Sequence, residues 1–382
     1  MRRRSLIVAL PMAPALFTVA ARAQNSGDKN SGDKDSLDKV ERKALTIKPF
    51  LLESGVVMPE IVIAYETYGT LAPDGRNAVL LTHGFTSSQH MAGRYADTGA
   101  EGSWDGLVGP GKAIDTDKLF VVSSNMLGSS YGSTGPAFLN PATRTPYGPS
   151  FPDITLVDIV NAQRVLLEQL GVRHLLAVAG PSFGGYQAFQ WGVTHPDFVD
   201  GLVPVVSAPK GSGGEAAVKS LVAQLARDPH WNNGWYYDNG GITATLTEMR
   251  IATLKRYGID DQLAARFPDP VQREAEIARR ASAWAHVFDG NSLVTLRKAS
   301  VRFDAAKDFG RMKARVLYVL SRTDKVFPPS IAPGVMAALK AAKVDADYFE
   351  IDSEFGHSAS GLDAAKWALR LKAFMTSLRK RI

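Results

Sequence analysis

The chain contains 382 residues, of which 45% are hydrophobic and none is cysteine. A chain of this length and composition can bury a large core, and the absence of cysteine excludes disulfides, thiolate metal sites and a cysteine nucleophile. Four of the 44 basic residues precede the first acidic residue, Asp28, so removal of the N-terminal segment before it would leave 40 basic against 38 acidic residues. This balance argues against binding to nucleic acid or an anionic membrane.

Residues 1–23 have the three-part pattern of a signal peptide. Arginines occupy positions 2–4, residues 6–20 are apolar but interrupted by proline, and residues 21–23 read Ala-Arg-Ala. The small residues at this last site predict cleavage before Gln24. The apolar stretch is too short to span a bilayer, so we expect no stable membrane insertion. The pattern predicts an exported protein, periplasmic or secreted, and leaves the Sec and Tat routes open.

Residues 24–43 follow as a polar segment with a direct repeat of Asn-Ser-Gly-Asp-Lys. The repeat contains no apolar residue and can bury nothing, so we expect a disordered spacer. Beyond it, short β-rich runs alternate with helical stretches, which is typical of an α/β fold with a mostly parallel sheet covered on both faces. We expect strands at 45–51, 60–68, 78–82, 119–123, 175–179, 201–206, 316–320 and 348–351, and helices at 156–170, 185–194, 331–341 and 363–378.

The alternation stops between residues 209 and 307. Helical stretches at 215–227, 242–257 and 270–288 follow one another there without a strand. This predicts a helical cap, residues 209–307, inserted into an α/β core of residues 44–208 and 308–382. The aromatic residues of the cap are candidates for the walls of a substrate pocket, above all Trp231, Trp235 and Tyr236, with Tyr237 and Trp284. The alternative is that they hold the cap together, since most large aromatics are packing residues.

Two stretches match Gly-x-Ser-x-Gly, one around Ser130 and one around Ser182. A nucleophile elbow needs a buried strand before the serine and a helix after it, so that the hydroxyl is exposed at a helix N-terminus. Ser182 follows the expected strand 175–179 and precedes a helical stretch. Ser130 leads into Gly132-Ser133-Thr134-Gly135-Pro136, which cannot continue as a helix. We therefore assign Ser182 as the nucleophile and Ser130 as a loop residue.

A serine nucleophile needs a histidine base, and the histidine needs a carboxylate that holds its tautomer. In this fold the three occur in the order Ser, Asp or Glu, His. Asp324 comes just past the expected strand 316–320, and His357 comes after the last strand. One helix and one strand separate them, which is the spacing that brings two such loops together. The sequence therefore predicts a triad of Ser182, Asp324 and His357.

An oxyanion hole needs two backbone N–H groups aimed at one point. One is expected from Phe183, directly after the nucleophile. The other is expected from Phe85, in the loop after strand 78–82, where the neighbouring His83 has a structural role. The sequence contains no P-loop, no dinucleotide-binding glycine motif and no histidine and carboxylate cluster at metal-ligand spacing, so we expect no cofactor and no metal.

Several stretches resemble the homoserine O-acetyltransferase-like family of α/β-hydrolase enzymes. They are Tyr65-Glu66-Thr67-Tyr68-Gly69-Thr70, residues 104–117, Tyr131-Gly132-Ser133-Thr134-Gly135-Pro136, residues 140–143, the elbow, Asp228-Pro229-His230-Trp231 and the loops of Asp324 and His357. The resemblance covers nearly the whole chain after the leader. It implies the same triad and a helical cap of a kind often used for dimerisation, which makes a homodimer through the cap an expectation.

The resemblance does not extend to two residues that hold the substrate. Members of the family typically bind the substrate carboxylate with a cap arginine and its ammonium with an aspartate directly after the catalytic histidine. Here Ser358 follows His357 and becomes a pocket candidate, while the arginine position falls near Val222, with Arg227 close by. A zwitterionic amino acid would then lose both charged partners in a closed pocket, at a cost of several kcal/mol.

The main prediction is therefore a carboxylic ester hydrolase that acts on a small or medium small-molecule ester through acyl-Ser182, since water needs neither charged partner. An exported enzyme would also lack acetyl-CoA, a cytoplasmic metabolite. The alternative is an O-acyltransferase of homoserine O-acetyltransferase type, which moves an acyl group to an alcohol or amino-acid acceptor. A third class, a non-catalytic binding module, is disfavoured by the intact triad. The acyl group, the alcohol and the oligomeric state stay open.

Overall fold

The computed structural model describes residue 37 and residues 39–379. The predicted signal peptide and most of the predicted spacer lie outside the described residues, so both stay predictions there. The expectation of a spacer that reaches residue 43 is wrong at its C-terminal end. Val40 donates its N–H to the carbonyl of Arg94, whose N–H returns to the carbonyl of Leu37. Leu37 and Val40 also pack against the core, which gives these apolar residues a burial that the polar repeat before them lacks.

A single eight-stranded sheet carries the core of the protein. Its strands are β1 (Lys43–Ile47), β4 (Ile61–Tyr68), β5 (Ala78–Thr82), β8 (Phe120–Ser124), β9 (Leu175–Pro181), β10 (Val199–Val205), β11 (Arg315–Ser321) and β12 (Ala346–Ile351). They lie in the order β1-β4-β8-β5-β9-β10-β11-β12. From β8 to β12 in this order neighbouring strands are parallel, whereas the pairs β1–β4 and β4–β8 are antiparallel. The predicted α/β-hydrolase architecture is confirmed.

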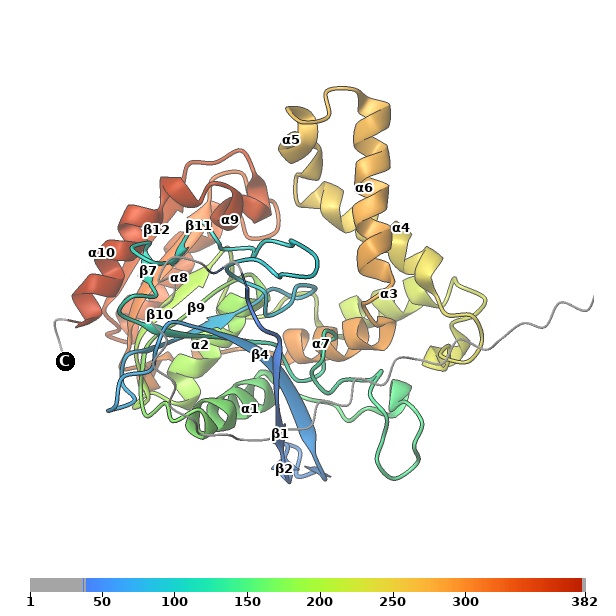
Figure 1. Cartoon of the computed structure of the whole chain (residues 1–382), viewed down its shortest axis with the longest axis horizontal. Helices are drawn as coiled ribbons and strands as arrows, with labels where there is room; N and C mark the ends of the chain where they lie inside the picture. The colour runs from blue at the N-terminus through green and yellow to red at the C-terminus, as the bar shows by residue number, and fades with distance from the viewer. Residues whose placement is uncertain (1–36, 38, 380–382) are drawn as a thin grey trace, which may run out of the picture. The chain divides into compact units, whose positions relative to one another are not determined.

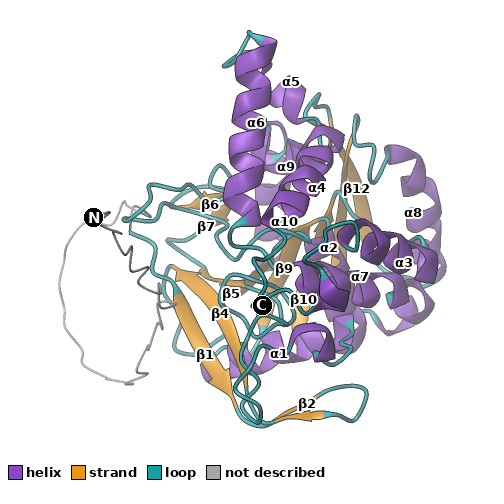
Figure 2. Cartoon of the chain, turned by 90° about the vertical axis from the view of Figure 1, so that its right-hand side faces the viewer, coloured by secondary structure: helices purple, strands orange, loops and turns teal. Residues whose placement is uncertain are grey.

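Helices cover both faces of this sheet (Figures 1 and 2). Helices α1 (Leu156–Gln169), α2 (Phe183–Thr194) and α8 (Ala332–Ala341) share one apolar cluster with one face. Helix α10 (Ala368–Arg379) packs on the other face. Strand β5 is buried at every residue and β9 at every residue except its last, Pro181, as expected for strands that lie between two helical layers. Both faces of the sheet are therefore filled, and only its edges and ends are available for a site.

The chain between β10 and β11 forms five helices in the described structure. They are α3 (Gly214–Leu225), α4 (Thr243–Arg256), α5 (Ile259–Ala264), α6 (Pro270–Ala285) and α7 (Gly290–Arg302). Aromatic and aliphatic side chains of this insertion build a separate apolar cluster, so it has a small core of its own. None of the described helices combines the length and apolar character that crossing a membrane requires.

Two expected elements are broken in the structure. The expected strand 45–51 divides into β1 and a short β2 (Phe50–Leu51) because Pro49 lies between them and has no N–H for a ladder. The expected helix 363–378 begins only at Ala368, after a short helix α9 (Ala359–Leu362) and a turn. The turn lets Trp367 lie buried against Trp104, a tertiary contact that local sequence cannot foretell. Helix α7 was not expected, because its polar first turn, Gly290-Asn291-Ser292, lacks the apolar spacing of a helix.

Candidate active site

Ser182 lies at a sharp turn between β9 and α2. Its backbone has φ 58° and ψ −119°, a conformation that non-glycine residues rarely adopt. Two contacts hold the turn: the Ser182 N–H donates to the Val205 carbonyl at 2.8 Å, and the Ser207 hydroxyl donates to the Ser182 carbonyl at 2.7 Å. The turn places Ser182 directly before the N-terminus of α2, where the helix dipole favours negative charge. This is the geometry of a nucleophile elbow.

Two glycines allow the turn to approach the neighbouring strand. A Cβ atom on Gly180 would lie 2.1 Å from the Thr82 carbonyl oxygen, and one on Gly184 would lie 2.2 Å from the same atom. Any side chain at either position would push the elbow away from β5. The Gly-x-Ser-x-Gly pattern thus has a packing cause at Ser182.

Asp324 and His357 lie at the same edge of the sheet as Ser182. Strands β9, β11 and β12 are parallel members of one sheet, and each of the three residues follows the carboxyl end of its strand. His357 Nδ1 lies 2.9 Å from Asp324 Oδ2, and both side chains are buried. Ser182 Oγ makes no hydrogen bond to His357 among the described contacts. Catalytic hydrogen bonds of this kind often form only when substrate binds.

The loop after β5 packs beside the elbow. A Cβ on Gly84 would lie 3.7 Å from Ser182 Cβ, and the rings of Phe85 and Phe183 are 5.8 Å apart. The backbone N–H groups of Phe85 and Phe183 donate to no other group among the described residues. Burial lowers the pKa of His83 to about 4, so its imidazole is neutral and suited to fixing the loop through Gly84 and Asn125 rather than to proton transfer.

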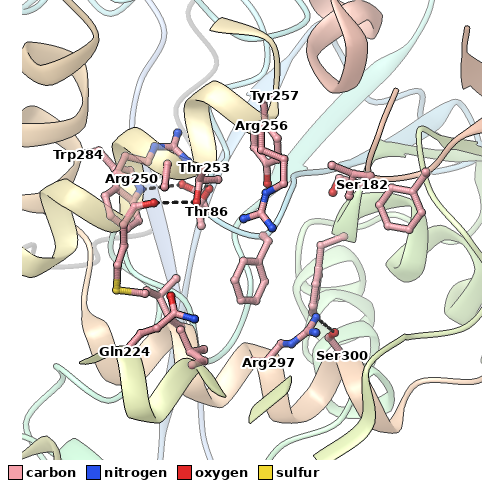
Figure 3. Close-up of a pocket in the computed structure, with 18 of the residues that line it drawn as sticks. Thr86, Ser182, Gln224, Arg250, Thr253, Arg256, Tyr257, Trp284, Arg297 and Ser300 are labelled. Atoms are coloured by element: carbon pink, nitrogen blue, oxygen red, sulfur yellow. Dashed lines mark hydrogen bonds between the residues drawn. The ribbon is translucent and has the colours of Figure 1, made fainter. Parts of the chain in front are cut away.

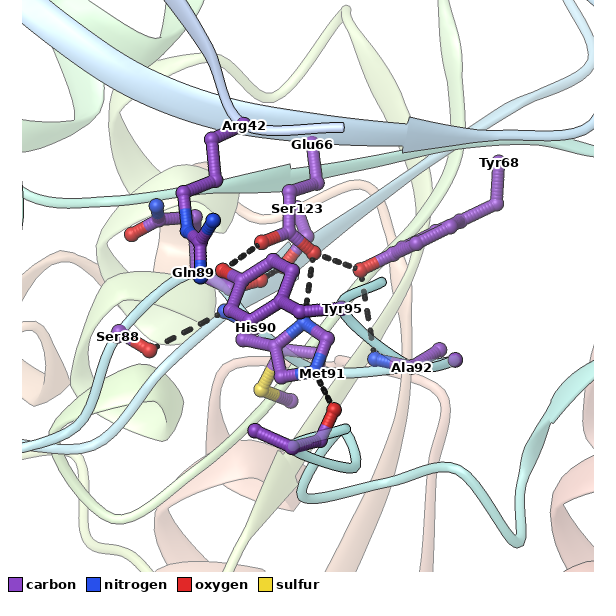
Figure 4. Close-up of polar contacts among 12 residues, drawn as sticks. Arg42, Glu66, Tyr68, Ser88, Gln89, His90, Met91, Ala92, Tyr95 and Ser123 are labelled. Atoms are coloured by element: carbon purple, nitrogen blue, oxygen red, sulfur yellow. Dashed lines mark hydrogen bonds and ion pairs between the residues drawn. The ribbon is translucent and has the colours of Figure 1, made fainter. Parts of the chain in front are cut away.

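A buried carboxylate fixes the rest of this loop (Figure 4). Glu66, on β4, accepts hydrogen bonds from the hydroxyls of Tyr68, at 2.5 Å, and Tyr95. His90 Nδ1 lies 3.1 Å from the same carboxylate, and His90 Nε2 lies 2.9 Å from the Ala100 carbonyl. A buried polar group needs such hydrogen-bond partners to be tolerated. The Tyr-Glu-Thr-Tyr stretch that carries part of the family resemblance therefore anchors the segment that follows Phe85.

A cavity of about 340 Å³ opens over Ser182, between the elbow and the inserted helices (Figure 3). Its walls include Phe85 and Thr86 after β5, Ser182, Phe183 and Tyr186 at the elbow, Arg250, Arg256 and Tyr257 around the end of α4, Trp284 on α6, and Arg297 on α7. Tyr257 and Phe327 line it as well, and their rings lie 4.6 and 5.8 Å from the His357 ring. Three arginines and no acidic residue line this cavity.

Arg250 has the most confined of these cationic groups. Its Nη1 donates to Thr86 Oγ1 at 2.8 Å, and its guanidinium lies 5.0 Å from the centre of the Trp284 ring. Its Nε–H is buried without a partner, and burial lowers the pKa of the guanidinium. No described acidic side chain forms an ion pair with Arg250. The cavity thus holds a charge that lacks a counter-ion.

Known proteins identify the family. The model of the alpha/beta hydrolase fold family matches residues 77–363. The chain is 37% identical to homoserine O-acetyltransferase from Symbiobacterium thermophilum, over 84% of this chain and 90% of that protein. It is 36% identical to homoserine O-succinyltransferase from Herminiimonas arsenicoxydans, over 87% and 93%. The chain belongs to the homoserine O-acetyltransferase-like family of the α/β-hydrolase superfamily.

Solved structures of both reaction types resemble this α/β hydrolase. Esterase E22 matches with a TM-score of 0.80 and 28% identity, over 88% of this chain and 100% of that chain. Homoserine O-acetyltransferase from Bacillus anthracis matches with a TM-score of 0.80 and 26% identity, over 88% and 98%. Both comparisons support an enzyme of this superfamily. The curated relatives favour acyl transfer, which was the alternative prediction, over hydrolysis.

The structure corrects the expected pocket residues of this family member. Trp231 and Tyr236 pack on each other inside the apolar cluster of the insertion, with ring centres 5.5 Å apart. Trp235 is 46% exposed. These three side chains and Ser358 do not line the cavity over Ser182. Trp231 and Tyr236 hold the insertion together, which was the alternative considered for them, whereas Trp284 does line the cavity.

Arg250, which lines the cavity, was not singled out from the sequence, whereas Val222, the position expected for the family's arginine, does not line it. The sequence did contain a usable signal. Arg250, Thr253 and Tyr257 recur at three- and four-residue spacing on one stretch expected to be helical, so they share one face. A polar face on an inserted helix needs either solvent or a ligand.

Ser130, the second serine with the motif, has a structural contact instead. Its Oγ accepts the N–H of Asp289 at 3.0 Å, at the start of α7. The loop of Ser130 is thereby hydrogen-bonded to the insertion at the start of α7.

The first test compares these two serines. A fluorophosphonate probe should label the wild-type protein and Ser130→Ala, and should not label Ser182→Ala, since only Ser182 lies at an elbow. Ser130→Ala should lower the free energy of unfolding by about 1 kcal/mol through the lost hydrogen bond. Mass spectrometry of the labelled protein and urea unfolding give the two readouts. Labelling that persists in Ser182→Ala would refute the assignment.

The second test concerns the carboxylate behind the base. Asp324→Asn should lower kcat for p-nitrophenyl acetate by a factor of about 10³–10⁴, because the amide holds His357 in the wrong tautomer. The fold should persist, since the Asn oxygen can still accept the Val326 N–H that Asp324 Oδ1 accepts at 2.7 Å. The rate and the melting temperature are measured on the same preparation. A rate within tenfold of wild type, with the fold intact, would argue against the triad.

Proposed function

We propose that this protein is an O-acyltransferase that moves an acyl group through acyl-Ser182 to the hydroxyl of an acceptor whose carboxylate binds Arg250. The observation that carries the proposal is the confined guanidinium of Arg250 in the cavity over Ser182, without an acidic partner among the described residues. The curated relatives, homoserine O-acetyltransferases and an O-succinyltransferase, support the same reaction class.

Arg250 is suited to a carboxylate for a physical reason. A guanidinium removed from water loses hydration that only hydrogen bonds to an anion replace well. Thr86 supplies one neutral acceptor, and the Nε–H remains unpaired. A substrate carboxylate would accept from the remaining N–H groups and neutralise the charge, an interaction that is about twice as strong as a neutral hydrogen bond.

The arrangement supports a two-step reaction. Ser182 Oγ attacks the carbonyl carbon of the donor while His357 takes the hydroxyl proton. His357 then gives that proton to the leaving group. The N–H groups of Phe85 and Phe183 are the proposed donors to the oxyanion. In the second step the acceptor hydroxyl attacks the acyl carbon, its proton passes to His357, and Ser182 leaves with that proton. Asp324 holds His357 in the required tautomer throughout.

Ester hydrolysis is the second candidate, and one observation favours it. No acidic residue lines the cavity, so an amino-acid acceptor would find a partner for its carboxylate and none for its ammonium. Water needs neither. The likeness to esterase E22 also supports this reaction. The two candidates share acyl-Ser182 and differ only in what attacks it.

The third test asks whether Arg250 selects the acceptor. The full chain is incubated with acetyl-CoA or p-nitrophenyl acetate as donor and with L-homoserine from micromolar to tens of millimolar. O-acetylhomoserine and acetate are quantified by mass spectrometry. The ester product should saturate with homoserine. Arg250→Met should raise the KM for homoserine by a factor of about 10²–10³, equivalent to about 3–4 kcal/mol for a lost charge-assisted pair.

Two further variants make this test specific. Arg250→Lys keeps the charge without the two-pronged geometry and should lie between wild type and Arg250→Met. Arg279→Met, an exposed arginine of α6 paired with Glu276, should leave the KM unchanged. Acetate released at a rate that homoserine does not alter, with no O-acetylhomoserine formed, would reject the transferase in favour of the hydrolase.

A further inference from the structure

The charge of the cavity over Ser182 suits only one end of an amino acid. Arg250, Arg256 and Arg297 line the cavity, and no aspartate or glutamate is among the described residues that form its wall. An amino acid with a hydroxyl brings three polar groups. Under the proposed function its hydroxyl meets acyl-Ser182 and its carboxylate binds Arg250. The third group, the ammonium, needs an anion or a set of free acceptors.

The buried carboxylates next to the cavity are already in use. Asp324 Oδ1 accepts the N–H of Val326 at 2.7 Å, and Asp324 Oδ2 lies 2.9 Å from His357 Nδ1. Asp289, at the start of α7, uses its oxygens inside the insertion, one of them for the N–H of Ser292 at 2.7 Å. Neither carboxylate lines the cavity, so neither is available to a substrate ammonium.

The acidic residues of the inserted helices α4 and α6 also lie outside the cavity. Glu248 precedes Arg250 by two positions on α4 and is exposed, and side chains two residues apart on a helix do not face each other. On α6, Glu274 pairs with Lys255 at 2.6 Å, and Glu276 pairs with an arginine of its own helix. These two helices therefore contribute arginines to the cavity and use their carboxylates elsewhere.

The neutral groups beside Arg250 are engaged as well. An aromatic ring can attract an ammonium, but the ring of Trp284 already lies 5.0 Å from the guanidinium. The ring of Tyr257 lies 4.6 Å from that of His357. The hydroxyl of Thr86 accepts a hydrogen bond from Arg250 at 2.8 Å. An ammonium would have to displace one of these contacts to gain a partner.

A positive charge of the protein also lies on the path between the two ends of the acceptor. An acceptor with its carboxylate at Arg250 and its hydroxyl at Ser182 spans the space between these residues. Arg256 lines the same cavity, and Figure 3 draws its guanidinium between Arg250 and Ser182. Charges of one sign repel, most strongly where water is excluded. An ammonium on the acceptor would therefore be repelled as well as unpaired.

We propose that the acceptor is a hydroxycarboxylic acid without an amino group. The inference rests on the proposed function, because it assumes acyl-Ser182 and a carboxylate at Arg250, and it names the class of the acceptor. The acceptor oxygen bonds to the acyl carbon as the bond from that carbon to Ser182 Oγ breaks. The hydroxyl proton of the acceptor passes through His357 to Ser182. The product is an ester that retains its free carboxylate.

The test compares γ-hydroxybutyrate with L-homoserine, which differ only in the amino group. p-Nitrophenyl acetate is the donor, and mass spectrometry quantifies both acetylated acceptors. Wild type should show a kcat/KM for γ-hydroxybutyrate at least about tenfold above that for homoserine, because an unpaired ammonium is costly to remove from water. Homoserine should still be acylated, with saturation at a higher concentration. Equal values, or a preference for homoserine, would overturn the inference and leave the transferase in place.

A pH series checks that the charge of the amino group causes the preference. The ratio of kcat/KM for homoserine over γ-hydroxybutyrate should rise between about pH 7 and about pH 10, as the ammonium loses its proton. The titration of His357 affects both acceptors and cancels in the ratio. Ser182→Ala supplies the background, which includes direct reaction of the free amine with the donor. A ratio that stays constant over this range would contradict the proposed cause.

Variants assign the carboxylate to its residue. Arg250→Met should lower the ratio of kcat/KM for γ-hydroxybutyrate over n-butanol, which has no carboxylate, by a factor of about 10²–10³. Arg250→Lys should retain part of this ratio, and Arg279→Met should leave it at the wild-type value. Circular dichroism and fluorophosphonate labelling check that each variant is folded with a reactive serine. A ratio that survives in Arg250→Met would overturn the proposed binding mode.

Two ligands without a hydroxyl separate this inference from the proposed function. Butyrate and L-α-aminobutyrate cannot be acylated on oxygen, so their inhibition of p-nitrophenyl acetate hydrolysis reports on binding alone. Butyrate should inhibit at a concentration at least about tenfold lower, and Arg250→Met should weaken its inhibition. If butyrate showed this preference but no alcohol were acylated, the proposed transferase would fail. The site for a carboxylate without an ammonium would then belong to an esterase.

Discussion

The contact between the elbow and the end of β5 is the constraint on which the site depends. Thr82 Oγ1 donates to the Gly184 carbonyl at 2.9 Å, while the Thr82 carbonyl occupies the space that a side chain on Gly180 or Gly184 would need. Because the chain continues from Thr82 into the loop of Phe85, this one contact sets the separation between Ser182 and the proposed second oxyanion donor, the Phe85 N–H. Interiors at native density transmit such displacements rather than absorb them.

The same loop also receives the insertion. Thr86 accepts a hydrogen bond from Arg250 on its hydroxyl and one from Trp284 Nε1, at 3.1 Å, on its carbonyl. Thr86 is the neighbour of Phe85, so the proposed carboxylate-binding residue and the proposed oxyanion donor are held by adjacent peptide groups. A substrate carboxylate bound to Arg250 would therefore influence the loop that carries the proposed oxyanion donor. Binding energy gained far from the reacting carbon can in this way help to position the groups that react.

The sequence allowed most of the sheet to be predicted, and little of the cavity. Strands such as β5 and β9 can be predicted because burial on both faces requires continuous apolar runs in the sequence. The elbow could be chosen over Ser130 because a helix must follow the nucleophile. Arg250 was missed since periodicity gives the polar face of α4 but not what lies opposite it. Trp231 was misassigned because the same aromatic residue fits a pocket wall and a small core equally well, and only tertiary packing decides.

The choice between water and an acceptor is a question of what the cavity holds beside acyl-Ser182. The proposed triad does not distinguish the two, because a histidine base can deprotonate water or an acceptor hydroxyl. A hydrolase of neutral esters has no use for a guanidinium confined without a counter-ion, since such a charge is expensive to bury. The presence of Arg250 over Ser182 therefore supports the proposed acceptor with a carboxylate. Arg250 lies on α4 and Arg297 on α7, so the cationic groups of the cavity come from separate helices. A transferase has to hold the acceptor hydroxyl beside the acyl carbon, whereas hydrolysis requires only water there.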